Sequence, residues 1–292
     1  MKKDKSILLL LSAMLLLISC EDPIQIKLDE GSKTYVIDAF VNDLRKDQVI
    51  KVKTTYSYFS NQEAPGVVGA IVVLKDLSAN KAYTFNHTSN GNYVYPIGLT
   101  DTIAKVNHQY ELNITIDGFT YTSLTTQKRT AKVDTILSIP EESIGPPKTD
   151  TIYNCLLIAR DKADNNPDYY WLRSFRNDSL IDEPNEVNIC VDGTQGVVID
   201  AATDSILFTP PSTFFNFKQF RKNAKVGIEI HSISKDNYYF FIQASAQINN
   251  GGLFATTPEN VKTNIENPAG AKTKAIGRFN MATVATYSCF VK

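Results

Sequence analysis

Strict alternation of apolar and polar residues over 110–117 is the feature that most limits what this chain can fold into. Alternation with a period of two places every second side chain of an extended strand on one face, which can then be buried. The dipeptide Asp117-Gly118 follows directly and favours a tight hairpin turn, and a second strand-like run occupies 119–124. The sequence therefore predicts two antiparallel strands that bury one face of a sheet.

Short runs rich in β-branched and aromatic residues recur along the rest of the chain, and turn signals such as Asn90-Gly91 separate them. In the first half, the predicted strands include 34–41, 48–54, 68–74 and 93–95. In the second half, they are 150–160, 169–176, 186–191, 196–199, 214–220, 226–232 and 286–291. The segment 253–280 is rich in Asn, Thr and Pro, so it is expected to be irregular until the last strand. Short strands at near-regular spacing are typical of a β-sandwich.

One helix is expected near 235–248. Ser234 can cap its first turn, and Asp236 places a negative charge at the positive end of the helix dipole. Tyr238 and Phe241 share one face of this segment, and the Asn- and Gly-rich run 249–252 ends it.

The Pro- and Gly-rich segment 139–149 interrupts the strand pattern and suggests a boundary between two parts of the chain. The predicted fold class is mainly β. An Ig-like or transthyretin-like β-sandwich over 34–130 is followed by a second β-rich domain with one helix over 131–292. The boundary can lie anywhere from 128 to 149, and a long loop inside one domain is the alternative interpretation of this segment.

The N-terminus has the pattern of a secretory signal. Three lysines precede the apolar run 7–18, and Ser19-Cys20 closes it. The run is short for a membrane span of about 20 residues, although an uncleaved transmembrane anchor is the alternative. A cysteine directly after a small residue resembles the lipobox of bacterial lipoproteins. That resemblance implies that 1–19 is removed as a signal peptide and that Cys20 is acylated, with palmitate as a typical chain.

Glu21-Asp22 follows the cysteine directly and resembles the acidic surface-export signal of Bacteroidetes-type lipoproteins. The other interpretation is an ordinary solvated tether, which we expect over 20–33. The expected location is therefore the outer membrane, lipid-anchored and at the cell surface. The formal net charge is −1 at pH 7, so electrostatic attraction does not favour nucleic acid as a partner.

Several short motifs occur in a fixed order along the chain. They are Cys20-Glu21-Asp22-Pro23, Tyr35-Val36-Ile37, Val68-Gly69-Ala70, Asn90-Gly91-Asn92-Tyr93, Tyr110-Glu111-Leu112, Tyr169-Tyr170-Trp171-Leu172, Ser232-Ile233-Ser234 and Asn264-Ile265. This order resembles an uncharacterised family of Bacteroidetes outer-membrane lipoproteins, known as a domain of unknown function. Its members are often encoded beside TonB-dependent receptors, so the resemblance implies such a receptor as partner and supplies no catalytic residue. The segment 68–95 is also similar to transthyretin-like and carboxypeptidase-regulatory-like sandwich domains.

The histidines and cysteines do not predict a catalytic or metal site. His87, His108 and His231 lack the spacing of a metal or catalytic motif and are expected at the surface or at strand ends. Cys155 and Cys190 lie in strand-like runs, where we expect them to be small buried hydrophobic residues. A disulfide bridge between them is an open alternative. We therefore expect no enzyme and no cofactor.

Two loops are candidates for binding. One supplies oxygen ligands that suit calcium from Asp161, Asp164 and Asp168, although a solvated turn explains the same composition. The other carries the aromatic residues Tyr56, Tyr58 and Phe59. These rings can form a contact surface or fold back over the end of the sandwich.

Five Asp-Ser/Thr-apolar tripeptides resemble the O-glycosylation motif of exported Bacteroidetes proteins. Their acceptor residues are Thr102, Thr135, Thr151, Ser179 and Ser205. The alternative is that the aspartate ends a turn and the next two residues start a strand. Modification of some of these sites is a hypothesis.

The function expected from the sequence is that of a surface-exposed outer-membrane lipoprotein that serves a TonB-dependent transport system as an accessory or ligand-binding component. The alternative is a structural or adhesive module of the cell surface. Both expectations rest on the anchor and on the family resemblance, because no catalytic motif follows Cys20.

Overall fold

The alternating run forms β6 (Gln109–Ile116), which pairs antiparallel with β7 (Phe119–Thr126) in the computed structural model. Asp117 and Gly118 connect the two strands with positive φ angles of 50° and 80°, as a tight hairpin turn requires. The predicted hairpin is confirmed. The structure describes residues 32–56, 62–98, 101–141, 151–161, 166–181, 187–191, 220–250, 257 and 261–292.

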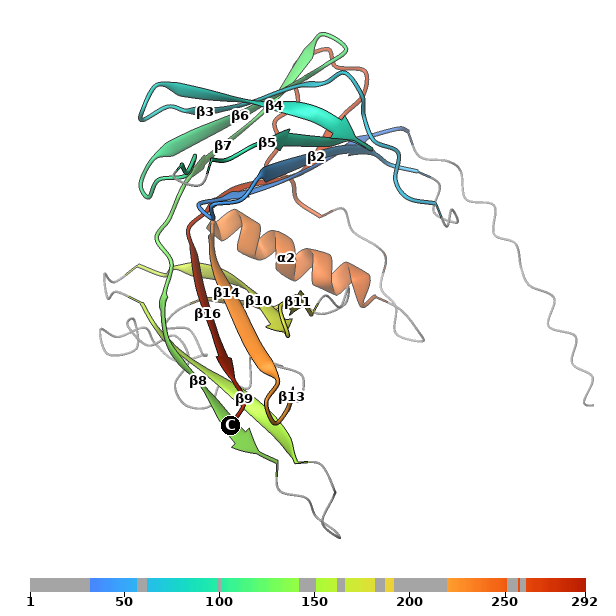
Figure 1. The fold of residues 1–292 in the computed structure, drawn as a ribbon. Helices are drawn as coiled ribbons and strands as arrows, with labels where there is room; N and C mark the ends of the chain where they lie inside the picture. The colour runs from blue at the N-terminus through green and yellow to red at the C-terminus, as the bar shows by residue number, and fades with distance from the viewer. Residues whose placement is uncertain are drawn as a thin grey trace, which may run out of the picture. The chain divides into compact units, whose positions relative to one another are not determined.

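Eight strands make one sheet in the order β15-β1-β2-β5-β4-β3-β6-β7. The further strands of this sheet are β1 (Tyr35–Asn42), β2 (Gln48–Thr54), β3 (Ile71–Asp76), β4 (Lys81–Ser89), β5 (Asn92–Tyr95) and β15 (Ala275–Ala282). The sheet folds over on itself, so that β3, β6 and β7 form one layer and β2 and β5 lie in the other (Figure 1). The predicted β-sandwich is thus confirmed.

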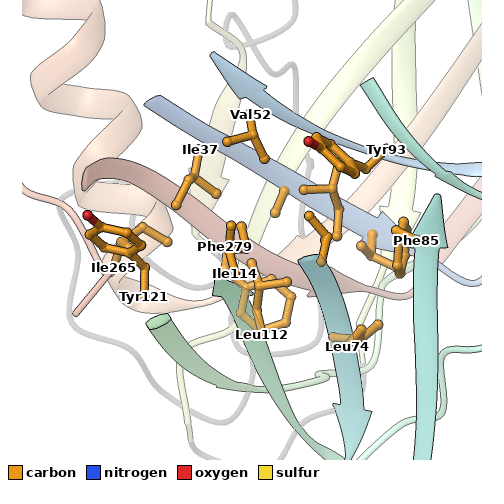
Figure 2. Close-up of a cluster of buried hydrophobic side chains, with 14 of the residues drawn as sticks. Ile37, Val52, Leu74, Phe85, Tyr93, Leu112, Ile114, Tyr121, Ile265 and Phe279 are labelled. Carbon is orange, nitrogen blue, oxygen red and sulfur yellow. The ribbon is translucent and has the colours of Figure 1, made fainter. Parts of the chain in front are cut away.

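The core of the sandwich fills the space between these two layers. Ile37 and Val52 project from one layer toward Leu74 and Ile114 of the other, and Phe279 of β15 lies among them (Figure 2). These five side chains are at most 1 % exposed. Burial of each such side chain stabilises the fold by roughly 1.5–3 kcal/mol, so the alternating pattern specifies which face of each strand turns inward.

The C-terminal part of the chain completes the sandwich. β15 pairs with β1 in parallel register, with Ile37 opposite Gly277. The prediction of irregular structure up to residue 280 is therefore wrong for this strand. From Arg278 to its end β15 is buried on both faces, so its sequence shows no alternation between apolar and polar residues.

Two smaller sheets follow the sandwich. The larger has the order β11-β10-β14-β16, with β12 paired to β10, and the smaller has the order β13-β9-β8. Their strands are β8 (Lys132–Pro140), β9 (Ile152–Arg160), β10 (Tyr169–Arg176), β11 (Ser179–Leu180), β12 (Ile189–Val191), β13 (Phe220–Arg221), β14 (Lys225–Ile233) and β16 (Val284–Phe290). Residues Lys33–Lys292 make up one compact unit, in which β15 from the predicted second range completes the first sheet.

The predicted helix is α2 (Lys235–Ile248), and its capping is confirmed. The Ser234 hydroxyl accepts a hydrogen bond from the backbone N–H of Asn237 at 3.2 Å, and Asp236 lies in the first turn. The helix contacts β10, β12 and β15. Within the described part of the chain, no helix has the length and apolar character needed to cross a membrane.

Candidate functional site

A pocket of about 260 Å³ lies where the β1–β2 hairpin faces β10 and β14. The hairpin contributes Asp38, Phe40, Lys46, Asp47 and Lys51 to its lining, and the facing sheet contributes Trp171, Arg173 and His231. Pockets for drug-sized ligands usually enclose about 300–1,000 Å³. This pocket therefore suits a smaller molecule.

The alternation of β10 explains why its two pocket residues lie together. Trp171 and Arg173 are two positions apart and project from the same face of the strand. Their antiparallel partners on β14 are His231 and Glu229, respectively. Cross-strand partners on one face lie about 4.5–5.5 Å apart at Cβ, so the four side chains form a single cluster.

Aromatic rings form one wall of the pocket. The ring of Trp171 lies 5.5 Å from that of Phe40 on β1 and 5.2 Å from that of Phe241 on α2, measured between centroids. The guanidinium carbon of Arg173 lies 5.3 Å from the centroid of the Trp171 ring, which is a cation–π distance. Trp171 therefore links the sandwich, the second sheet and the helix.

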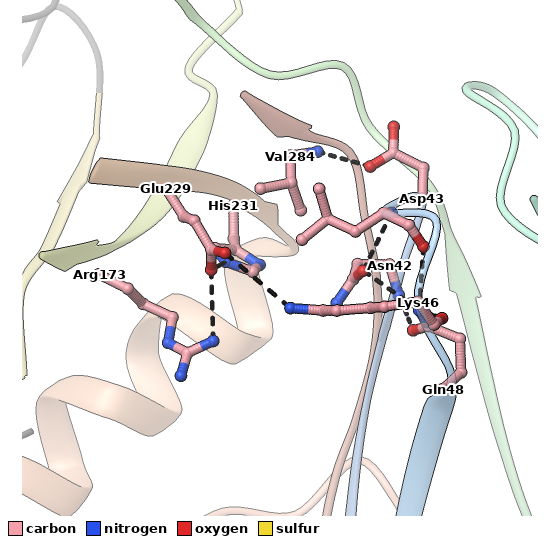
Figure 3. A network of polar contacts seen from close by, with 9 residues as sticks. Asn42, Asp43, Lys46, Gln48, Arg173, Glu229, His231 and Val284 are labelled. Carbon is pink, nitrogen blue, oxygen red and sulfur yellow. Dashed lines mark hydrogen bonds and ion pairs between the residues drawn. The ribbon is translucent and has the colours of Figure 1, made fainter. Parts of the chain in front are cut away.

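The carboxylate of Glu229 lies beside the pocket and has three nitrogen-bearing side chains around it, as Figure 3 shows. Its Oε2 lies 2.9 Å from Nε2 of His231 and 3.3 Å from Nη1 of Arg173. Its Oε1 lies 3.9 Å from Nζ of Lys46. A carboxylate only accepts hydrogen bonds, so Nε2 of His231 carries the proton.

Burial and charge set the protonation states of this pair. Burial lowers the pKa of His231 below its ordinary value, and the hydrogen bond to Glu229 opposes this only partly. Burial raises the pKa of Glu229, but the hydrogen bond from His231 and the charges of Lys46 and Arg173 outweigh it and lower the pKa overall. At neutral pH the imidazole is therefore neutral and the carboxylate is ionised. With the proton on Nε2, Nδ1 is the acceptor nitrogen of the His231 ring.

Hydrogen bonds within the hairpin hold the loop that carries Lys46. The buried amide of Gln48 donates to the carbonyl oxygens of Lys46 and Leu44, at 2.9 and 3.3 Å, and accepts from the backbone N–H of Asn42 at 2.9 Å. Asp43 accepts from the backbone N–H of Val284 at 2.9 Å. This bond fixes the loop to β16, and the network appears in Figure 3.

Several residues predicted from sequence as functional lie outside the described residues. They are Cys20, Glu21, Asp22, Tyr58, Phe59, Asp164 and Ser205. Tyr56 of the predicted aromatic loop is described, and its side chain is about half exposed and does not line the pocket. The alternatives proposed for these residues stay predictions.

The two described carboxylates of the predicted calcium loop both bind Arg129. Nε of Arg129 lies 3.2 Å from Asp161, and Nη2 lies 2.7 Å from Asp168. The hydroxyl of Tyr170 also donates to Asp161. One guanidinium thus pairs with both carboxylates and offsets one of their two negative charges. Across the described ranges, no three or more His, Cys, Asp or Glu side chains are grouped to hold a metal ion.

The described hydroxyls of the Asp-Ser/Thr sites differ in their surroundings. Thr102, Thr151 and Ser179 are exposed, and Ser179 begins β11 directly after a turn. Thr135 is half-buried inside β8, next to an irregularity in its pairing with β9. The interpretation that the aspartate ends a turn is therefore wrong for Asp134, which lies within the strand.

The structure corrects the sequence expectation for His231 and bears out that for Cys155. His231 is 4 % exposed and lies within β14, so it is neither a surface residue nor a strand-end residue. Its place opposite Trp171 depends on pairing between distant segments, although the alternation of Trp171 and Arg173 in β10 marks that face in the sequence. Cys155 is buried, as predicted, and its thiol is free, so the alternative of a disulfide bridge to Cys190 is wrong.

The family model described as a domain of unknown function (DUF4249) matches residues 21–288. The match covers most of the chain, so the chain belongs to this family, and the resemblance to an uncharacterised family is confirmed. A search of the curated proteins found no match.

Proposed function

We propose that this family member is an outer-membrane lipoprotein of the cell surface that binds a small ligand for a neighbouring TonB-dependent transporter. The N-terminal signal, Cys20 and Glu21-Asp22 support the location. The pocket between the β1–β2 hairpin and β10–β14 is the observation that carries the ligand-binding role.

The chemistry of the pocket suits recognition of a ligand. Trp171 and Phe40 offer apolar rings, Arg173 and Lys46 offer donors, and the neutral imidazole of His231 offers an acceptor. A few oriented polar groups beside an apolar wall are the usual composition of a binding pocket. Under this proposal the protein captures the ligand without making or breaking bonds and passes it to the transporter.

Two experiments test the location and the partner. Replacing Cys20 by Ala should abolish acylation and release the protein from the outer membrane, because no acyl chain would then hold it there. The native lipoprotein, extracted in mild detergent, should bring down a large β-barrel receptor. Recovery of the lipoprotein alone, together with normal nutrient uptake by a deletion strain, would refute the transport role.

The alternative is a structural or adhesive module, and one observation favours it. Val68, Ile71 and Leu124 of the sandwich are 74, 61 and 53 % exposed. Exposed apolar side chains can contact matrix or another cell. Under this alternative, charge reversal at exposed positions beside these residues should reduce cell adhesion, whereas substitutions in the pocket should have no effect on uptake.

A further inference from the structure

The two walls of the pocket carry opposite net charge. On the side of β10 and β14, Arg173 pairs with the carboxylate of Glu229. Lys46 reaches across from the β1–β2 hairpin, so its ammonium group lies on the same side and pairs with the same carboxylate. His231 adds no charge there at neutral pH, because its pKa is lowered by burial. This wall therefore has one positive charge more than it has negative charges.

The opposite wall is formed by β1 and β2. Asp38 on β1 and Lys51 on β2 are direct partners in the sheet, and their charged atoms lie 3.7 Å apart. Asp47 also lines this wall, and its carboxylate accepts from the backbone N–H of Ile97 at 3.2 Å. A backbone hydrogen bond leaves the negative charge of Asp47 in place. This wall therefore has one negative charge more than it has positive charges.

The ion pairs of both walls are loose. Lys46 and Lys51 lie 3.9 and 3.7 Å from their carboxylates, and both side chains are about half exposed. A lysine held in such a long, partly exposed pair contributes little to stability, so a ligand group can replace its partner. Arg173 is more buried and stacks on Trp171, which orients its remaining N–H donors.

From this arrangement we propose that the pocket binds a small zwitterion with an apolar side chain, such as a free apolar amino acid. Arg173 and Lys46 bind its carboxylate, Asp38 or Asp47 binds its ammonium group, and Phe40 and Trp171 contact its side chain. This assignment rests on the proposed ligand-binding function and names the ligand class for the same pocket. A neutral sugar would satisfy the aromatic wall but would leave the opposite charges of the two walls unused.

Trp171 is the only tryptophan in the chain, so excitation at a wavelength selective for tryptophan reports on this pocket alone. L-Phenylalanine added to the purified full-length protein should produce a saturable change in emission. L-Phenylalaninamide lacks the carboxylate and 3-phenylpropionate lacks the ammonium group. Each should bind at least about tenfold more weakly, because a charge-assisted hydrogen bond is lost. Glucose serves as the neutral comparison.

Variants locate the two charged contacts. Arg173→Gln and Lys46→Gln should each weaken phenylalanine binding at least about tenfold while leaving the weak binding of phenylalaninamide unchanged. Arg160→Gln is the matched control, because Arg160 is exposed and pairs with Asp134 between β8 and β9. Its affinity for phenylalanine should equal that of the wild type. Lys46 is about half exposed, so its variant should fold even if the Arg173 variant does not.

Equal affinity for phenylalanine, its amide and phenylpropionate would refute the zwitterion assignment, as would preferential binding of glucose. No response to any of the four compounds would also refute it. In each of these cases the transport role is judged separately, by co-purification with a β-barrel receptor. Binding of phenylalanine by a protein that brings down no receptor would support the ligand class and count against the transport role.

Discussion

Gly277 on β15 lies so close to Ile37 on β1 that a Cβ atom at Gly277 would overlap the carbonyl oxygen of Ile37. The two residues are direct partners in the parallel pairing of their strands. Gly277 also has a φ angle of 128°, which side chains other than glycine rarely allow. The attachment of the C-terminal segment to the first strand therefore depends on the absence of a side chain at this position.

Replacing Gly277 by Ala should lower the free energy of unfolding by about 3 kcal/mol or more, because both the φ angle and the overlap add strain. Urea unfolding measures the change. Gly270 separates the two causes, since its φ angle is 77° and a Cβ there would meet nothing within 4 Å. Gly270→Ala should cost only about 1 kcal/mol. Equal costs for both variants would contradict the close approach to Ile37.

Asn237 joins the start of α2 to β15, so replacing it should lower the stability of the fold. Its buried amide donates to the carbonyl of Phe279 and to Asn280, both at 3.0 Å, and accepts from Nε of Arg278 at 2.7 Å. Asn237→Ala should lower the free energy of unfolding by about 2–3 kcal/mol, because buried donors and acceptors lose their partner. Ser234→Ala removes the helix cap and should cost about 1 kcal/mol. A cost for Asn237→Ala no larger than that of the cap variant would contradict this role.

The stability of the fold should decrease as the pH falls below about 6.5, partly because of His231. Burial lowers the pKa of His231 in the folded state, so between that pKa and 6.5 the unfolded chain binds more protons. Stability therefore rises with pH across this window. Glu229, Arg173 and Lys46 face the imidazole, and the lowered pKa of Glu229 keeps that carboxylate ionised there.

The His231→Gln variant removes this titration. Its melting temperature should fall less than that of the wild type between pH 7.5 and pH 5.5. The exposed residue His87 provides the control, and His87→Gln should keep the pH dependence of the wild type. The same slope in wild type and His231→Gln would show that His231 takes up its proton equally well in both states.

Cys155 should resist modification in the folded protein. Burial raises the pKa of its thiol from the ordinary value of 9.0 to about 11, which lowers the thiolate fraction at neutral pH about 100-fold. In a Cys190→Ser/Cys289→Ser variant, alkylation of Cys155 should be at least about 100-fold slower than in the same protein in urea. Mass spectrometry of the labelled peptide gives both rates. Equal rates would mean that the β9 core opens readily to solvent.

Local pattern was sufficient for elements whose stability is decided by neighbouring residues. The hairpin of β6 and β7 follows from alternation and from Asp117-Gly118, and α2 follows from the cap at Ser234. β15 was missed because much of it is buried on both faces. Two of its polar residues, Arg278 and Asn280, are buried and donate hydrogen bonds to Asn237 and Ser232 of distant segments, so neither alternation nor composition marks the strand.

The sequence by itself determined the β-rich class, the helix over 235–248 and the faces on which apolar residues lie, because these depend on periodicity and turn chemistry. Only the tertiary structure decided that β15 joins β1 and that Phe40 meets Trp171 beside His231. Parallel pairing and contacts between sheets join residues far apart in the chain, and their energy comes from side chains that meet only after folding. The pocket therefore exists only in the folded chain. In the sequence, none of its residues differs from an ordinary strand residue.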